Sequence, residues 1–208
     1  YSIEGVLDYY STLSWVLRDG IRTQVTALSE LEPVQFDEPI GTLEAFHTAG
    51  GLSTMAWRYE GTIPLMEYKT LRYPGHAQLM SAMRDLGLFD STPIDVKGVQ
   101  VVPRDLFIAQ VGPKLRRPGG QDLVALRVIV TGMKNGHACT REYDLLDYYD
   151  AEHDITAMMR VTGYTLSITG QLMASGALPS GVYTPDEVFP GDRYIAELAK
   201  RNINIRMR

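Results

Sequence analysis

A long β-hairpin is the feature of this sequence that most constrains its fold. Two alternating runs of apolar and polar residues fill the segment QDLVALRVIVTGMKNGHACTREYDLLDYYD at 121–150 and meet at Lys134-Asn135-Gly136. An Asn-Gly pair supplies the positive φ angles of a two-residue hairpin turn. Because antiparallel strands of this kind commonly bury one face, the hairpin predicts a sheet that needs helices over it.

Helices and shorter strands are predicted on both sides of the hairpin. Apolar residues at helical spacing predict helices over 2–17, 76–87, 103–111 and 154–175, and shorter ones near 185–187 and 191–201. Alternation predicts strands over 21–28, 33–36, 43–48, 62–73 and 203–207. These elements predict an α/β or α+β fold, with a mixed, largely antiparallel sheet covered by helices.

The composition is that of one globular domain. The chain has 208 residues, 45% hydrophobic and 22% charged, enough for one core. No apolar run reaches the roughly 18 to 20 residues of a membrane span, and no leader with a cleavage site is visible. Cys139 has no second cysteine to pair with, which agrees with a reducing compartment. We therefore expect a cytoplasmic protein that does not bind membranes.

The charge of the chain argues against nucleic acid as a partner. The net charge is −5, whereas nucleic-acid binding draws most of its affinity from neutralised phosphates. The one compact basic stretch, Lys114–Arg117, lies between Pro and Gly residues and is typical of a solvated loop. Neither G-x-G-x-x-G nor G-x-x-x-x-G-K-[ST] occurs, and no Cys/His cluster has zinc-ligand spacing. We expect this chain alone to bind no nucleotide and no metal.

A glycine pair among hydroxyl residues marks the candidate site, in EAFHTAGGLST at 44–54. Gly50 and Gly51 allow a sharp turn and a close approach to the backbone N–H groups. Thr48 can donate a hydrogen bond to a carboxylate, as can the hydroxyls that follow the glycines. His47 is the candidate proton acceptor, and a histidine that only supports the fold is the alternative.

Several charged residues have two interpretations each. Arg72, at a strand end, can clamp a substrate carboxylate or form a structural ion pair. Arg160 lies inside a helix of small residues, where a buried charge demands a partner. Glu142 and Asp144 look like a solvated face of the hairpin, and His76 looks like the start of a helix.

Six segments together resemble a known family. They are EAFHTAGGLST, MEYKTLRYPGH, PRDLFIAQVGPKLR, LVALRVIVTG, YDLLDYYD and ITAMMRVTGYTLSITGQL. In their order and in their residues, these segments are similar to the carboxyl-terminal domain of the saccharopine dehydrogenase family, and most of all to its lysine 6-dehydrogenase-like branch. The resemblance runs from Tyr1 to about Arg206, essentially the whole chain.

This resemblance implies an oxidoreductase that uses NAD or NADP and acts on the C–N bond of an amino acid. Residues 1–208 would be its substrate-binding and dimerisation domain, preceded by a Rossmann domain that this chain lacks. The implied partners are the amino-acid substrate, that Rossmann domain and a second copy of the chain. Without the Rossmann domain, the fragment would bind no cofactor and would be inactive. The first residue is Tyr1 rather than Met, which agrees with the expectation of a missing amino-terminal portion.

The resemblance also assigns substrate-binding positions. In saccharopine-forming relatives, the segment matching YSIEGV reads like S-P-R-G-V, and its arginine is thought to hold a substrate carboxylate. Here that position is Glu4, which would attract an ammonium group instead; an acid that favours the helix dipole is the alternative. Other family motif positions fall on Thr48, Gly50, Gly51, Arg72, Tyr73 and Gly75.

Two further interpretations stay open at this point. The chain can be a non-enzymatic homodimerisation or interaction module, in which the long hairpin joins two copies. It can also belong to a saccharopine-type or carboxynorspermidine-type dehydrogenase of the same family. The choice between NAD and NADP depends on a residue of the Rossmann domain that contacts the ribose.

Overall fold

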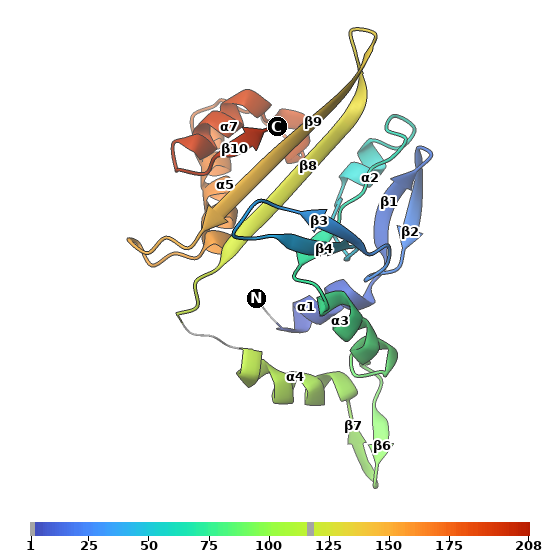
Figure 1. Ribbon diagram of the computed structural model, residues 1–208. Coiled ribbons are helices and arrows are strands. Elements are labelled where there is room, and N and C mark those ends of the chain that lie inside the picture. Colours follow the sequence, from blue (N-terminus) through green and yellow to red (C-terminus); the bar gives the residue numbers. More distant parts are fainter. Residues whose placement is uncertain (1–2, 116–118) are drawn as a thin grey trace. The chain divides into compact units, whose positions relative to one another are not determined.

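The computed structural model describes residues 3–115 and 119–208. The chain divides into two compact units, 1–117 and 118–208 (Figure 1). Helices and antiparallel sheets make up both units, and the predicted α+β class is confirmed. The described residues form four separate sheets, whereas the sequence predicted one mixed sheet. In the same residues, no helix is both long and apolar enough to cross a membrane. The single domain over 1–208 stays a prediction.

The first unit contains short helices and small sheets. In chain order its elements are α1 (Ile3–Ser11), β1 (Ser14–Arg18), β2 (Ile21–Val25), β3 (Glu32–Gln35), β4 (Thr42–Phe46), α2 (Met55–Arg58), β5 (Thr70–Arg72), α3 (His76–Asp85), β6 (Ile94–Val96), β7 (Val99–Val101) and α4 (Pro103–Leu115). Strand β4 is central between β3 and β5, and it is buried from its second residue onward.

The core of the first unit joins helix α1 to strand β4 and helix α3. Its fully buried members are Leu7, Tyr10, Phe46, Ala77 and Phe89. The ring centroids of Tyr10 and Phe46 are 6.4 Å apart, so helix α1 packs directly on the end of the central strand. Burying a side chain such as Leu7 contributes roughly 1.5 to 3 kcal/mol, which holds α1 in place beside the candidate site.

The helix predicted over 2–17 is wrong beyond Ser11, because the chain there becomes strand β1. Asp19 and Gly20 have φ angles of 52° and 77°. Two successive positive φ angles make the hairpin turn that joins β1 to β2, so the Asp-Gly pair that looked like a helix end is a strand connection. Ser2, the expected helix cap, lies outside the described residues.

Two other boundaries differ from the sequence prediction. The strand predicted over 62–73 is reduced to β5, and before it Met66 makes a single bridge to Leu17. Pro64 lies in this stretch and cannot donate to a strand ladder. Helix α4 continues through Pro113 to Leu115, where a loop was predicted, so the basic stretch starts in a helix and Arg116 and Arg117 lie outside the described residues.

The hairpin dominates the second unit and confirms the prediction made from its turn. Its elements are β8 (Leu123–Lys134), β9 (His137–Tyr148), α5 (Ala157–Ala174), α6 (Pro185–Val188), α7 (Gly191–Ala199) and β10 (Ile205–Met207). Asn135 and Gly136 have φ angles of 54° and 79°, as the tight turn requires. The strand order is β10-β9-β8, so β8 is the edge of its sheet.

Helices α5 and α7 and strand β10 lie along the hairpin in this unit (Figure 1). Their core is Leu145, Ile168, Leu172, Leu198 and Ile203. Arg160 of α5 is a buried charge, and it has the ion-pair partners that such a position requires. The guanidinium of Arg160 donates to Asp147 at 3.0 Å and to Asp150 at 2.9 Å.

The expectation of a solvated acidic face on the hairpin is wrong for Asp144. This residue is only 9% exposed. It lies opposite Arg127 in the strand register, and the guanidinium donates to its carboxylate at 2.7 Å. That hydrogen bond lowers the pKa of Asp144, against the opposing effect of burial, so the carboxylate is charged and paired.

Candidate functional site

The candidate site of the first unit lies where the chain leaves strand β4. Antiparallel pairing of Phe46 with Thr70 brings the residues after β4 beside those before β5. We call residues 47–51 the glycine loop. The N–H of Ala49 donates to the carbonyl of Tyr9 at 3.1 Å, which ties the loop to the end of helix α1.

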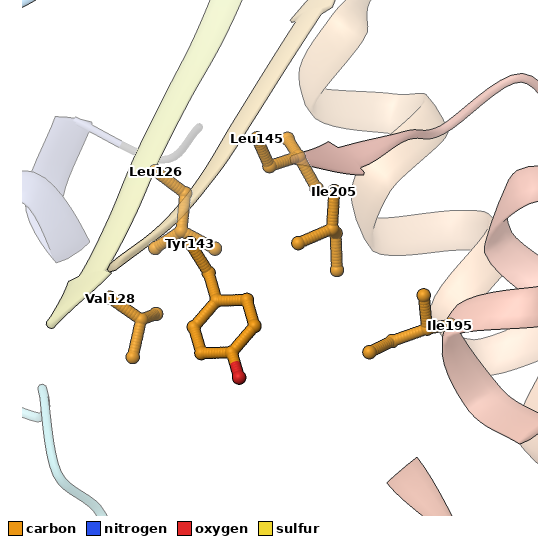
Figure 2. Close-up of a pocket in the computed structure, with 6 residues that line it drawn as sticks. All are labelled: Leu126, Val128, Tyr143, Leu145, Ile195 and Ile205. Atoms are coloured by element: carbon orange, nitrogen blue, oxygen red, sulfur yellow. The ribbon is translucent and has the colours of Figure 1, made fainter. Parts of the chain in front are cut away.

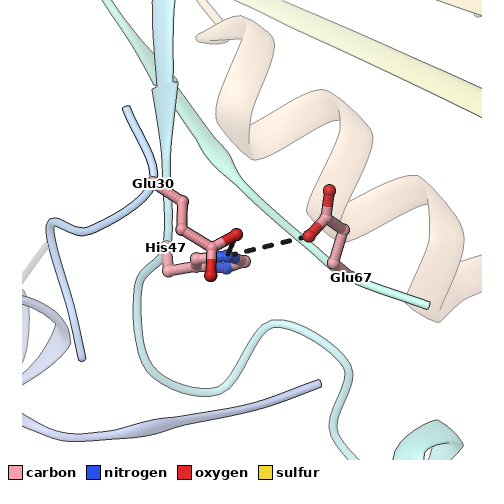
Figure 3. A group of neighbouring side chains, drawn as sticks. All are labelled: Glu30, His47 and Glu67. Atoms are coloured by element: carbon pink, nitrogen blue, oxygen red, sulfur yellow. Dashed lines mark hydrogen bonds and ion pairs between the residues drawn. The ribbon is translucent and has the colours of Figure 1, made fainter. Parts of the chain in front are cut away.

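His47 is fully buried, and both of its ring nitrogens face oxygen atoms. Nδ1 is 3.2 Å from the carbonyl oxygen of Tyr68. Nε2 is 3.2 Å from a carboxylate oxygen of Glu30 (Figure 3). Neither nitrogen is therefore left to receive a proton from a substrate in this arrangement. The geometry favours the supporting role, and catalysis by His47 stays a prediction.

Glu30, His47 and Glu67 form a cluster whose atoms have the chemistry of metal ligands. One ligand atom from each lies within 4.8 Å of the others (Figure 3). However, Nη2 of Arg18 donates to Glu30 at 2.8 Å and to Glu67 at 2.6 Å. This guanidinium already supplies the positive charge that a metal would bring to the two carboxylates, so the cluster is better described as an ion-pair network.

Lys69 extends the network on the same side of the chain. Its ammonium donates to Glu32 at 2.8 Å and to the carbonyl of Glu30 at 3.0 Å. The pKa of Glu30 is lowered, mainly by its hydrogen bond with His47, which acts against burial. The network thus keeps Glu30 ionised and fixes the chain on both sides of the glycine loop.

Thr48 is buried against a second hydroxyl rather than exposed to a ligand. Its Oγ1 is 2.7 Å from Oγ1 of Thr70, and the two residues are 4% and 9% exposed. Thr70 in turn donates to the hydroxyl of Tyr68 at 3.5 Å. The polar anchoring predicted for Thr48 would therefore have to reach a substrate through another group.

Both glycines of the loop are needed by its backbone. Gly50 has a φ of 80°, in the left-handed region that favours glycine. A Cβ atom at Gly51 would lie 2.1 Å from Cδ1 of Tyr68, so the loop rests directly on that ring. Sequence reasoning missed Tyr68, although its spacing from Thr70 places both on one side of an extended chain.

Arg72 lies beyond this cluster, at the exposed end of β5. Its Nη1 donates to the carbonyl of Leu71 at 2.7 Å. Across the sheet it is opposite Glu44, whose carboxylate accepts from the N–H groups of Gly75 at 3.0 Å and Ala77 at 2.6 Å. Glu44 thus caps the start of α3, where a negative charge is favourable. The guanidinium of Arg72 stays at the surface, which is compatible with substrate binding.

His76 begins helix α3, as the sequence indicated, and it contacts the core. Its Nε2 is 2.9 Å from the hydroxyl of Tyr10, and its ring stacks on Phe46 with 6.3 Å between centroids. Burial lowers the pKa of His76, and the charge of Arg72 lowers it further.

Glu4 is exposed in the first turn of α1, at the helix end away from the glycine loop. Arg104 of α4 donates to the carbonyl of Glu4 and pairs with Asp8 at 2.6 Å. The pKa of Arg104 is raised, chiefly by the hydrogen bond with Asp8, with a contribution from Glu4. The structure thus groups His47, Thr48 and the two glycines, while Glu4 stands at the other end of the helix that contacts them.

Comparison with known proteins assigns the chain to a family. The saccharopine dehydrogenase C-terminal domain matches residues 1–203. The chain belongs to that family. Among solved structures it is similar to saccharopine dehydrogenase (L-Glu forming) from Saccharomyces cerevisiae, in its apo, histidine-tagged form, with a TM-score of 0.74 and 17% identity. The match covers 100% of the present chain and 61% of the yeast chain. At 17% identity, this likeness establishes the fold.

Proposed function

We propose that this chain is the substrate-binding domain of an NAD- or NADP-dependent oxidoreductase that acts on the C–N bond of an amino acid. The observation that carries the proposal is the family match over residues 1–203, which includes the glycine loop. Since the chain has no G-x-G-x-x-G fingerprint, the cofactor would be held by a Rossmann domain in another part of the protein.

In this proposal, the domain positions the carbon that bears the substrate nitrogen and excludes water from it. A bound nicotinamide would supply the hydride acceptor: the substrate amine would lose a hydride from this carbon and a proton from its nitrogen, and the resulting imine would be hydrolysed or would cyclise. Gly50 and Gly51 offer backbone N–H groups, and Arg72 offers a charge for a carboxylate. The fully buried His47 keeps the loop in place.

We propose L-lysine as the preferred substrate, as in the lysine 6-dehydrogenase-like branch. The support is Glu4, an exposed acid at the position where saccharopine-forming relatives are thought to use an arginine. A carboxylate there favours an ammonium group over an acidic substrate. Saccharopine-type and carboxynorspermidine-type activities are the alternatives within the family.

The test is an assay of the full-length protein with each of NAD⁺ and NADP⁺. L-lysine, L-saccharopine and carboxynorspermidine are supplied in turn, and the absorbance of the reduced nicotinamide is followed. We expect the highest kcat/KM with L-lysine, and a Glu4→Arg variant to lose that preference while a Glu152→Arg variant keeps it. Absence of nicotinamide reduction with all three substrates would refute the proposed function, and a preference for saccharopine would refute only the lysine assignment.

A second candidate function, assembly of two copies, is favoured by the hairpin. Strand β8 is a sheet edge, and its side chains Val128, Ile129 and Val130 are 44%, 57% and 55% exposed. An apolar hollow lies beside it, lined by Leu126, Val128, Tyr143, Leu145, Ile195 and Ile205 (Figure 2). A long edge of β-branched residues is open to pairing with another strand. We propose that the protein forms a homodimer through this edge, with or without enzymatic activity.

A further inference from the structure

The segment 67–70, which leads into β5, has two different faces, because successive side chains of an extended chain alternate. Glu67 and Lys69 take part in the ion-pair network. Tyr68 and Thr70 contact the glycine loop instead. The network therefore fixes the backbone from one side and sets the place of Tyr68 on the other.

Three hydroxyl groups, those of Thr48, Thr70 and Tyr68, lie next to one another in this region. Oγ1 of Thr70 is 3.5 Å from the hydroxyl oxygen of Tyr68 and 2.7 Å from Oγ1 of Thr48, and in the shorter contact either hydroxyl can donate. Within the described residues, the hydroxyl oxygen of Tyr68 has this one contact, in which it accepts. In that contact the phenol donates to no group of the described residues, so its hydrogen is available to a further acceptor.

Burial decides which of these hydroxyls a ligand can reach. Thr48 is 4% exposed and Thr70 is 9% exposed, whereas Tyr68 is 40% exposed. The ring of Tyr68 is also held in place before any ligand arrives, since the loop backbone at Gly51 lies against its Cγ and Cδ1 atoms. A fixed donor loses little rotamer freedom on binding, which favours affinity.

We propose that Tyr68, rather than Thr48, donates the hydroxyl hydrogen bond of this site to the carboxylate of an amino-acid substrate. This inference rests on the proposed function and adds to it a residue that determines specificity for a carboxylate.

The experiment compares two substrates in the full-length enzyme, with and without the phenol. Wild type and Tyr68→Phe are assayed with L-lysine and with cadaverine, which lacks the carboxylate. We expect Tyr68→Phe to raise KM for L-lysine about tenfold, the loss typical of a hydrogen bond to a charged group, with kcat changed less than about twofold. With cadaverine, the two proteins should have the same KM.

Tyr183→Phe is the matched control, because it removes the hydroxyl of an exposed tyrosine in the second unit. It should behave as wild type with both substrates. Equal KM values of wild type and Tyr68→Phe for L-lysine would overturn the inference, as would an equal loss with cadaverine. If wild type turns over saccharopine or carboxynorspermidine instead, the same comparison uses that substrate and its analogue without one carboxylate. A wild-type enzyme inactive on all of them would defeat the proposed function, and this inference with it.

Discussion

At the scale of single residues, the glycine loop depends on the absence of a side chain at Gly51. A Cβ atom there would lie 2.1 Å from Cδ1 and 2.6 Å from Cβ of Tyr68, so the ring or the loop would have to shift. We expect Gly51→Ala to lower the free energy of unfolding by about 1 to 3 kcal/mol, the usual cost of overpacking.

Urea denaturation measures this loss, and helix α5 offers a matched control. A Cβ atom at Gly163 would meet nothing within 4 Å. Gly163→Ala should therefore raise the stability by about 0.5 to 1 kcal/mol, since alanine has the higher helix propensity. A Gly51→Ala protein as stable as wild type would show that the loop does not rest on Tyr68.

We expect His76 to make the stability of the first unit depend on pH. Burial, and then the charge of Arg72, lower the pKa of this histidine below its ordinary 6.5 in the folded protein. The unfolded chain therefore takes up a proton first as the pH falls. By linkage, the stability contribution is present above about pH 6.5 and is lost as the pH falls toward the lowered value.

The measurement is the free energy of unfolding of wild type and His76→Gln at several values between about pH 7.5 and 5. We expect the loss of stability toward low pH to be smaller in His76→Gln. His137→Gln, which alters an exposed histidine at the hairpin turn, should keep the slope of wild type. Parallel slopes for all three proteins would contradict the role of His76.

At the scale of elements, what the sequence could predict depends on how local the signals are. The hairpin around Asn135 was predicted because its turn and both strands are encoded within one continuous segment. The boundary between α1 and β1 was missed, since the apolar residues up to Leu17 fit a helical period equally well. The two-residue turn at Asp19 and Gly20, which pairs β1 with β2, decides for the strand, and this local signal was interpreted as the end of a helix.

The candidate site shows where local signals end. Gly50 and Gly51 were predicted from their own conformational freedom. The place of Tyr68 under the loop and of Arg18 between two carboxylates depends on register across the first unit. Local propensity carries no information on such contacts, which join residues far apart in the chain.

Arg18 links three segments of the chain, so replacing it tests how much the ion-pair network contributes to stability. The guanidinium contacts Glu30 and Glu67, and Arg18→Ala would leave these carboxylates facing each other beside His47. Because the side chains are partly exposed, we expect a loss of about 1 to 3 kcal/mol, below the cost of breaking a fully buried pair.

Zinc provides the second arm of this experiment. Without Arg18, the cluster of Glu30, His47 and Glu67 is open to a cation. We expect Zn²⁺ to raise the melting temperature of Arg18→Ala and to leave that of wild type unchanged. Stabilisation of wild type by Zn²⁺ would mean that the cluster is a metal centre and that Arg18 gives way to the ion.

At the scale of the whole molecule, the edge of the hairpin sheet bears on assembly. Strand β8 has no partner on its outer side within the described sheet, and it contains neither Pro nor an acidic residue. Antiparallel pairing of β8 with its copy would satisfy both edges by one two-fold axis, which is the commonest symmetry of soluble oligomers.

We therefore expect the full-length protein to be a dimer in size-exclusion chromatography with light scattering. Ile129→Lys puts a charge in the middle of the edge, where the side chain is 57% exposed, so it should yield monomers that keep their circular dichroism spectrum. Leu166→Lys, which changes an exposed apolar residue of α5, should stay dimeric. A monomeric wild type, or a dimeric Ile129→Lys, would exclude β8 as the interface. If the Ile129→Lys monomer retains full turnover of the amino-acid substrate, assembly and catalysis are separate properties of this fold.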